Sequence, residues 1–92
     1  MKDYRTLETA ARNTQTTVAT LIEFGTAGWI DVVSKDGRTF ISSQDEYRSR
    51  FILHLRKKLG LSDKQIGVVL ADMKAPYSLE QVAEILGRVQ SN

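Results

Sequence analysis

The strongest constraint on this chain is a helix-starting motif that occurs three times. The pattern Ser-x-x-Glu/Gln stands at residues 43–46, 62–65 and 78–81. In such a capping box the serine hydroxyl accepts a hydrogen bond from the third amide after it, and the Glu or Gln side chain bonds back to the serine amide. Apolar residues at helical spacing follow each box. We therefore expect three helices, one beginning at each serine.

Two shorter helices are expected nearer the start of the chain. Apolar residues at i, i+3 and i+4, preceded by a capping Thr6, predict a helix over residues 6–13. Thr16 or Thr17 can cap a second helix over 17–24. Gly25 follows it and is suited to the left-handed conformation that commonly ends a helix.

The segment between the second and third helices has the composition of strands. β-branched and aromatic residues from Trp29 to Ile41 flank the pair Asp36-Gly37, which is typical of a tight hairpin turn. We expect a small two-stranded wing here, with Trp29 as a core residue. The expected fold is mainly α, with about five helices and this wing.

The apolar faces of the last three helices supply the rest of the candidate core. Gly60 should end the first of them, and Pro76 should separate the second from the third. Leu53 falls outside the main apolar face of the first of these helices, and is either partly exposed or covered by the last helix. The faces carry Tyr47, Phe51, Ile52, Leu55 and Leu59, then Ile66, Val69, Leu70 and Met73, then Leu79, Val82, Leu86 and Val89.

Length and composition indicate a single folded domain. The chain has 92 residues, of which 41% are hydrophobic and 26% charged. We expect one domain over 1–92, with a core over 6–73 and a C-terminal helix over 78–90. It has no cysteine and no apolar run near the roughly 18 residues that span a bilayer. We therefore expect a cytoplasmic protein with neither disulfides nor a membrane span.

The residues give little support for catalysis. His54 is the only histidine and has no second ligand at metal-binding spacing. Asp45 and Glu46 are adjacent carboxylates, but a helix N-terminus favours anions, so capping explains both. The six glycines are scattered and form no phosphate-binding loop. We expect a protein that is not an enzyme and uses no cofactor or metal.

Charge is concentrated in the middle of the chain. Residues 32–59 hold seven Lys and Arg against three Asp and Glu, whereas the net charge of the whole chain is +2. Arg50, His54 and Lys57 share one helix face, with Arg56 and Lys58 nearby. This ridge is either a contact surface for phosphates or an acidic partner, or a solvated face whose last cations suit a helix C-terminus. The sequence leaves both interpretations open.

The order helix, turn, helix, wing, long helix resembles the winged helix-turn-helix arrangement of the MerR family. The resemblance spans about residues 6–73 and implies a MerR-type fold. It is carried by Thr20-Leu21 with Phe24 and Gly28-Trp29-Ile30, by Gly37-Arg38-Thr39-Phe40, and by Leu59-Gly60-Leu61-Ser62 with Ile66.

Ile22 and Glu23 depart from the MerR pattern, because DNA-binding MerR proteins carry an Arg and a Tyr there. The segment 17–25 contains no Lys or Arg, the side chains that usually meet DNA phosphates. The lack of these cations is similar to the chaperone-modulator (CbpM-like) group. The segment Ile66-Gly67-Val68-Val69-Leu70 also resembles part of the fourth helix of that group. The resemblance implies a modulator or inhibitor that binds the J-domain of a DnaJ-type co-chaperone.

Two functional hypotheses follow. In the first, a non-catalytic regulator meets a basic J-domain helix through Ile22, Glu23, Asp31 and Asp72. In the second, a small MerR-like transcriptional regulator, phage- or plasmid-borne, binds DNA. Its expected contacts are Thr16, Thr17, Thr20, Lys35, Arg38, Arg50 and Lys57. A structural subunit of a larger assembly is a third, unspecific alternative, and the chain is expected to be a monomer or a homodimer.

Overall fold

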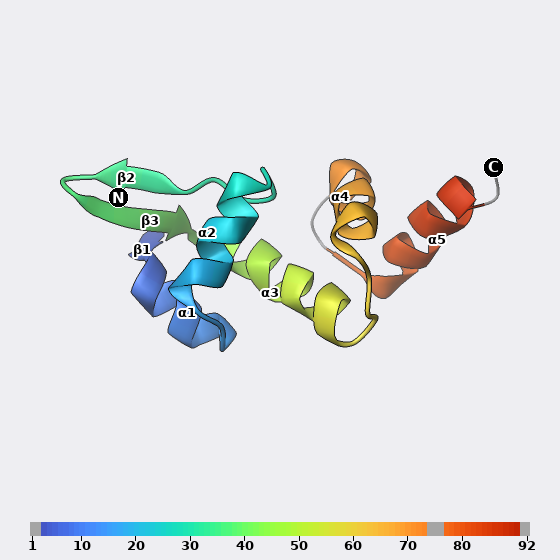
Figure 1. Cartoon of the computed structure of the whole chain (residues 1–92), viewed down its shortest axis with the longest axis horizontal. Coiled ribbons are helices and arrows are strands. Elements are labelled where there is room, and N and C mark those ends of the chain that lie inside the picture. Colours follow the sequence, from blue (N-terminus) through green and yellow to red (C-terminus); the bar gives the residue numbers. More distant parts are fainter. Residues whose placement is uncertain (1–2, 74–76, 91–92) are drawn as a thin grey trace. The chain divides into compact units, whose positions relative to one another are not determined.

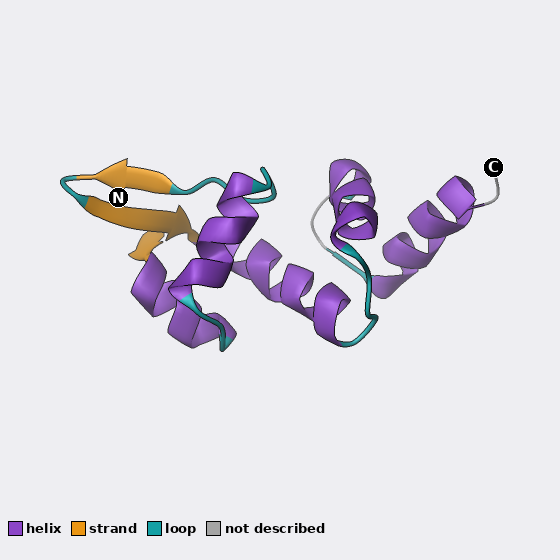
Figure 2. Ribbon diagram, viewed as in Figure 1, coloured by secondary structure: helices purple, strands orange, loops and turns teal. Residues whose placement is uncertain are grey.

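The computed structural model describes residues 3–73 and 77–90, with side chains up to residue 87. Over these residues the protein is mainly helical, with five helices and a three-stranded antiparallel sheet (Figures 1 and 2). The chain divides into two compact units, residues 1–50 and 51–92, and the boundary falls inside helix α3 (Ser43–Lys57). The expectation of one domain over 1–92 stays a prediction.

The first unit combines a small sheet with two short helices. Strand order is β1-β3-β2, and α1 packs against α2, β1 and β3. Its buried apolar side chains come from both helices, from the segment after α2 and from β3. The elements are β1 (Tyr4–Thr6), α1 (Leu7–Thr14), α2 (Val18–Thr26), β2 (Val33–Lys35), β3 (Arg38–Ser42) and the first half of α3. The core is Leu7, Ala10, Ala11, Leu21, Phe24, Ile30 and Ile41.

The expected hairpin is present, because β2 pairs antiparallel with β3, but the sheet also has a third strand that was not expected. β1 pairs antiparallel with β3, with Tyr4 opposite Ser42 and Thr6 opposite Phe40. The three residues of β1 are too few for a periodic pattern to show in the sequence. They form a strand because they pair with the edge of β3, which lies far along the chain.

The turn of the hairpin confirms its sequence signature. Asp36 and Gly37 have φ values of 54° and 75°, and Lys35 pairs with Arg38 on either side of them. Positive φ at both central residues is the requirement of a type I′ turn, which matches the twist of the flanking strands. Asp-Gly meets this requirement at little steric cost.

The starts of the first two helices lie within one residue of the predictions. Thr6 caps α1 by accepting a hydrogen bond from the Thr9 amide at 3.2 Å, and Thr17 caps α2 by accepting one from the Thr20 amide at 3.1 Å. The predicted stop at Gly25 is wrong. α2 continues to Thr26, and Gly28, with φ of 80°, takes the left-handed conformation instead.

Trp29 follows this stop and is half-buried. Its ring centroid lies 5.6 Å from that of the buried Phe24, with the rings tilted by 44°. Its amide donates to the Phe24 carbonyl at 2.9 Å. The tryptophan therefore holds the loop against the end of α2. The expectation that it is a core residue is met only in part, because its side chain is half-buried.

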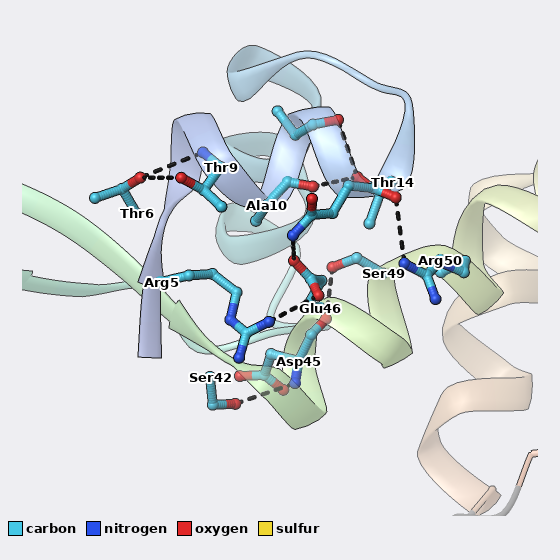
Figure 3. Close-up of polar contacts among 12 residues, drawn as sticks. Arg5, Thr6, Thr9, Ala10, Thr14, Ser42, Asp45, Glu46, Ser49 and Arg50 are labelled. Carbon is cyan, nitrogen blue, oxygen red and sulfur yellow. Dashed lines mark hydrogen bonds and ion pairs between the residues drawn. The ribbon is translucent and has the colours of Figure 1, made fainter. Parts of the chain in front are cut away.

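The expected Ser43 capping box at the start of α3 is wrong by one residue. The Ser42 hydroxyl accepts from the Asp45 amide at 3.0 Å, as Figure 3 shows. The Glu46 carboxylate is bound instead by Arg5 and Asn13, from β1 and α1. A buried position between three elements gives Glu46 charged and polar partners that outcompete a backbone amide at its own helix end.

The second unit is built from helices. It holds the rest of α3, α4 (Asp63–Asp72) and α5 (Leu79–Gln90). The Ser62 capping box of α4 is confirmed in both directions, with Gln65 bonding back to the Ser62 amide. At α5 the Ser78 hydroxyl accepts from the Gln81 amide at 3.3 Å. Gly60, with φ of 63°, lies just beyond the end of α3.

Most of the predicted core of this unit is buried, with differences at helix ends. Leu53 is covered, so the buried face of α3 is wider than one stripe. Leu59 and Leu79 are exposed, since one lies past the end of α3 and the other is the first residue of α5. Tyr47, in the first unit, is also exposed. Pro76 and the side chain of Val89 lie outside the described residues. The buried side chains of the second unit are Ile52, Leu53, Leu55, Ile66, Val69, Leu70, Met73, Val82 and Ile85.

Candidate functional site

The sequence singled out Ile22 and Asp31, and the structure brings these two to the same groove. The groove lies between α2 and the loop that leads to β2, and has a volume of about 330 Å³. Ile22 is 48% exposed on α2, Glu23 is exposed beside it, and Asp31 is exposed on the loop. The full lining is Ile22, Gly25, Thr26, Ile30, Asp31 and Val32.

Helix α3 holds the loop in place through two polar contacts. Arg48 Nε donates to the Trp29 carbonyl at 2.6 Å, and Asp45 Oδ2 accepts from the Asp31 amide at 3.0 Å. A hydrogen bond to a charged group is roughly twice as strong as a neutral one. The Asp45 contact uses the backbone of Asp31, so it fixes this residue without occupying its carboxylate.

Gly25 explains how α2 and the loop come close together. A Cβ at this position would lie 2.8 Å from Val32 Cγ2, closer than van der Waals contact permits. The glycine therefore sits inside α2 because Val32 packs against its bare backbone, despite the lower helix propensity of glycine. Gly25 resembles a helix stop in the sequence because the contact with Val32 leaves no mark on the local pattern.

Asp72 lies in the second unit, in a different groove. It lines a space of about 170 Å³ with Gln81, Glu84 and Ile85, between α4 and α5. Asp72 is exposed at the last residue of α4. It belongs to an acidic surface of its own unit.

The wing residues proposed for DNA contact are also brought together. Lys35 and Arg38 face each other in the strand register at the tip of the hairpin, and both are exposed. With Asp36 and the half-buried Phe40 they line a groove of about 480 Å³. Two adjacent cations on a projecting turn can reach a polyanion, although Asp36 between them reduces the local positive charge.

The threonines proposed for base contact have structural partners. Thr17 Oγ1 accepts from the Thr20 amide and lies 2.9 Å from Thr20 Oγ1, so these two hydroxyls bond to each other at the N-terminus of α2. Thr16 is half-buried, and its amide donates to the Ala11 carbonyl at 2.9 Å. Contact with bases would have to compete with the cap.

The predicted basic face of α3 falls on both sides of the unit boundary. In the first unit Arg50 is exposed and donates to the Asn13 carbonyl at 3.2 Å. In the second unit His54 and Lys57 are exposed, while Arg56 forms a 3.0 Å ion pair with Asp63. Two of these cations, Arg50 and Arg56, therefore have partners within the fold.

Glu46 is a buried charged residue whose role the sequence analysis missed. It is 8% exposed. Its carboxylate accepts from Arg5 Nη1 at 3.0 Å, the ion pair drawn in Figure 3, and from Asn13 Nδ2 at 2.9 Å. These contacts join β1, α1 and α3 in one network. Both acceptor oxygens are used within the fold, so Glu46 is a structural residue of the first unit.

Neither a metal-binding group nor a membrane span was detected in the part of the chain that the structure describes. Among these residues no three His, Cys, Asp or Glu side chains are arranged to hold a metal ion. None of the described helices has the length and apolar character needed to cross a bilayer.

Comparisons with known proteins do not add to this picture. No protein-family model, curated protein or solved structure matches the chain at a significant level. A function for this chain therefore has to be inferred from its own residues and from its surface grooves.

Proposed function

We propose that this chain is a non-catalytic binding domain of the MerR-like winged helix-turn-helix type that regulates a DnaJ-type co-chaperone by binding its J-domain. The order α1, α2, hairpin, α3, α4 is compatible with the arrangement that the sequence resembles. In that arrangement the second helix is the one presented to a partner.

One observation carries the proposal: the groove beside α2 combines exposed aliphatic surface with negative charge. Ile22 and Asp31 line it, and Glu23 is exposed on the same helix. Residues 17–26 contain no Lys or Arg. Such a surface suits a basic protein segment and disfavours DNA, whose phosphates would be repelled. Regulation would follow from occupancy, because a J-domain held here cannot use the same surface elsewhere.

Calorimetric titration of the chain with a purified J-domain tests this proposal. Glu23→Lys should weaken binding about tenfold, because it replaces attraction by repulsion at the contact. The matched control is Glu8→Lys, an equal change of charge at an exposed position on α1, which should alter affinity less than about twofold. Absence of binding by the unaltered protein, or equal losses in the two variants, would overturn the proposal.

The role proposed for Asp72 is measured separately, because it lies in the second unit. Asp72→Lys should weaken the same J-domain interaction if both units contact the partner. An unchanged affinity would remove Asp72 from the partner surface and leave the groove beside α2 as the site.

The second candidate function is a small DNA-binding regulator, and the paired Lys35 and Arg38 at the wing tip favour it. Binding that depends on phosphate contacts weakens steeply with salt, because bound counterions are released. The test is a fluorescence-anisotropy titration with duplex DNA over a range of salt concentrations, repeated with Lys35→Glu/Arg38→Glu. Lack of binding at low salt, or a salt dependence that the double variant leaves unchanged, would rule out this function.

A further inference from the structure

The groove beside α2 has features that specify the chemistry of its occupant more closely. Its aliphatic lining comes from the exposed Ile22, the half-buried Val32 and the buried Ile30. At about 330 Å³ it is near the lower limit of roughly 300–1,000 Å³ for pockets that enclose small molecules. Because it is also open to solvent, its size suits one large side chain of a partner.

The shape of the groove is set before any partner arrives. Arg48 and Asp45 of α3 bind the loop at Trp29 and Asp31, at 2.6 Å and 3.0 Å. Gly28, whose amide donates to the Gly25 carbonyl at 3.0 Å, turns the chain from α2 into this loop. A preformed surface loses less conformational entropy on binding than a mobile one, so modest contacts here are sufficient for recognition.

The exposed charged side chain that lines the groove is negative. Asp31 lines the groove and is exposed, and the Asp45 carboxylate lies against the Asp31 amide. Glu23 is exposed on α2 next to Ile22 but does not line the groove. Arg48 also contacts the loop, but it is half-buried and donates to the Trp29 carbonyl. A cation placed next to the aliphatic lining would therefore be attracted, and an anion repelled.

From these observations we infer that the groove binds a basic amphipathic helix, which inserts one Leu or Ile side chain between Ile22 and Val32 and places a neighbouring Lys or Arg against Asp31. The inference rests on the proposed function in taking this face as the partner surface. It does not require the partner to be a J-domain. The helix is the form in which an aliphatic residue and a cation one turn away share a face.

The test uses the full chain labelled with ¹⁵N and a short synthetic peptide of Leu and Lys, patterned as an amphipathic helix. Amide shifts on titration should concentrate at Ile22, Ile30, Asp31 and Val32. Replacing the central Leu of the peptide by Ala should weaken binding about tenfold, and replacing its Lys residues by Glu should abolish it. Asp31→Asn in the protein should weaken binding about threefold, because one attractive charge is lost. Glu8→Gln on α1 is the matched control and should leave the affinity unchanged.

The outcomes separate this inference from the proposed function. If the Leu/Lys peptide does not bind, shifts residues outside the groove, or is matched by the Glu peptide, the inference is wrong whatever the J-domain does. If the peptide binds as expected while a purified J-domain does not, the groove specificity stands and the co-chaperone proposal falls.

Discussion

Glu46 lies in the first turn of α3, yet its carboxylate is bound from outside that helix. Arg5 and Asn13 hold its two oxygens at 3.0 Å and 2.9 Å, and the residue is almost completely buried. A buried carboxylate is tolerated when its lone pairs are used by charged and polar donors. Its removal leaves Arg5, also partly buried, without its counter-charge.

We therefore expect Glu46→Ala to lower the free energy of unfolding by about 2–3 kcal/mol, through the lost ion pair and hydrogen bonds. Gln44→Ala is the matched control, because Gln44 is exposed in the same turn of α3, and it should change stability by less than about 0.5 kcal/mol. Urea denaturation followed by circular dichroism measures both. Equal losses would show that the network contributes nothing specific.

Gly25 provides a second residue-scale prediction. Alanine favours a helix over glycine by up to about 1 kcal/mol, but here its Cβ would meet Val32 at 2.8 Å. Because overpacking costs about 1–3 kcal/mol, Gly25→Ala should destabilise the protein by about 1 kcal/mol. In a Val32→Ala background the same change should become stabilising. The two backgrounds form a double-mutant cycle, and the absence of coupling would contradict the packing argument.

Gly87 in α5 is the matched control for the glycine argument. Among the described residues, no atom outside its immediate surroundings lies within 4 Å of a Cβ added there. Gly87→Ala should therefore stabilise the protein by several tenths of a kcal/mol, as expected at an unhindered helical position. Both glycines lie inside helices, and the contact with Val32 distinguishes Gly25 from Gly87.

Among the elements, α3 has two neighbouring serines at its start, and only one of them is its cap. Ser42 Oγ accepts from the Asp45 amide, the bond that the sequence assigned by spacing to Ser43 and Glu46. Ser42→Ala should cost about 1 kcal/mol of unfolding free energy, the usual value of a helix cap. Ser43→Ala should cost clearly less. Thermal or urea denaturation of the two variants decides between the caps, and a larger loss for Ser43→Ala would restore the capping box that the sequence predicted.

The helices could be predicted from the sequence because their signals are local. Thr6 and Ser62 each cap the helix they were expected to start, and Thr17, one of two candidates, caps α2. Apolar residues at helical spacing follow each cap within a few positions. Strand β1 could not be predicted, since it exists only through pairing with β3. Local periodicity carries no information about an edge supplied from far along the chain.

The candidate site was predictable in part for the same reason. Ile22 and Glu23 were named because they stand where DNA-binding MerR proteins carry an Arg and a Tyr, in a segment without Lys or Arg. Asp31 was named from its charge alone, and its place in the groove depends on the bonds from α3 to the loop. The role of Arg48 was missed, because a contact between a side chain and a distant carbonyl leaves no mark on the local pattern.

At the scale of the whole molecule, the two units raise the question of cooperativity. They contain residues 1–50 and 51–92, and α3 continues through the boundary. Units of this size are close to the limit of about 40 residues below which chains rarely fold without further stabilisation. Because each unit would leave half of α3 without support if it unfolded, we expect the two to unfold together, as the single-domain prediction requires.

Conservative changes in each core test this expectation. Ile66→Val in the second unit and Ile41→Val in the first each remove one methylene from a fully buried side chain, at a cost of about 1 kcal/mol. Trp29, the only tryptophan, reports on the first unit by fluorescence, while circular dichroism reports on all helices. If unfolding is cooperative, both probes have one midpoint, and either substitution lowers it for both. A Trp29 transition that Ile66→Val leaves unmoved would show instead that the chain contains two independent domains, because the loss in one unit would then not reach the other.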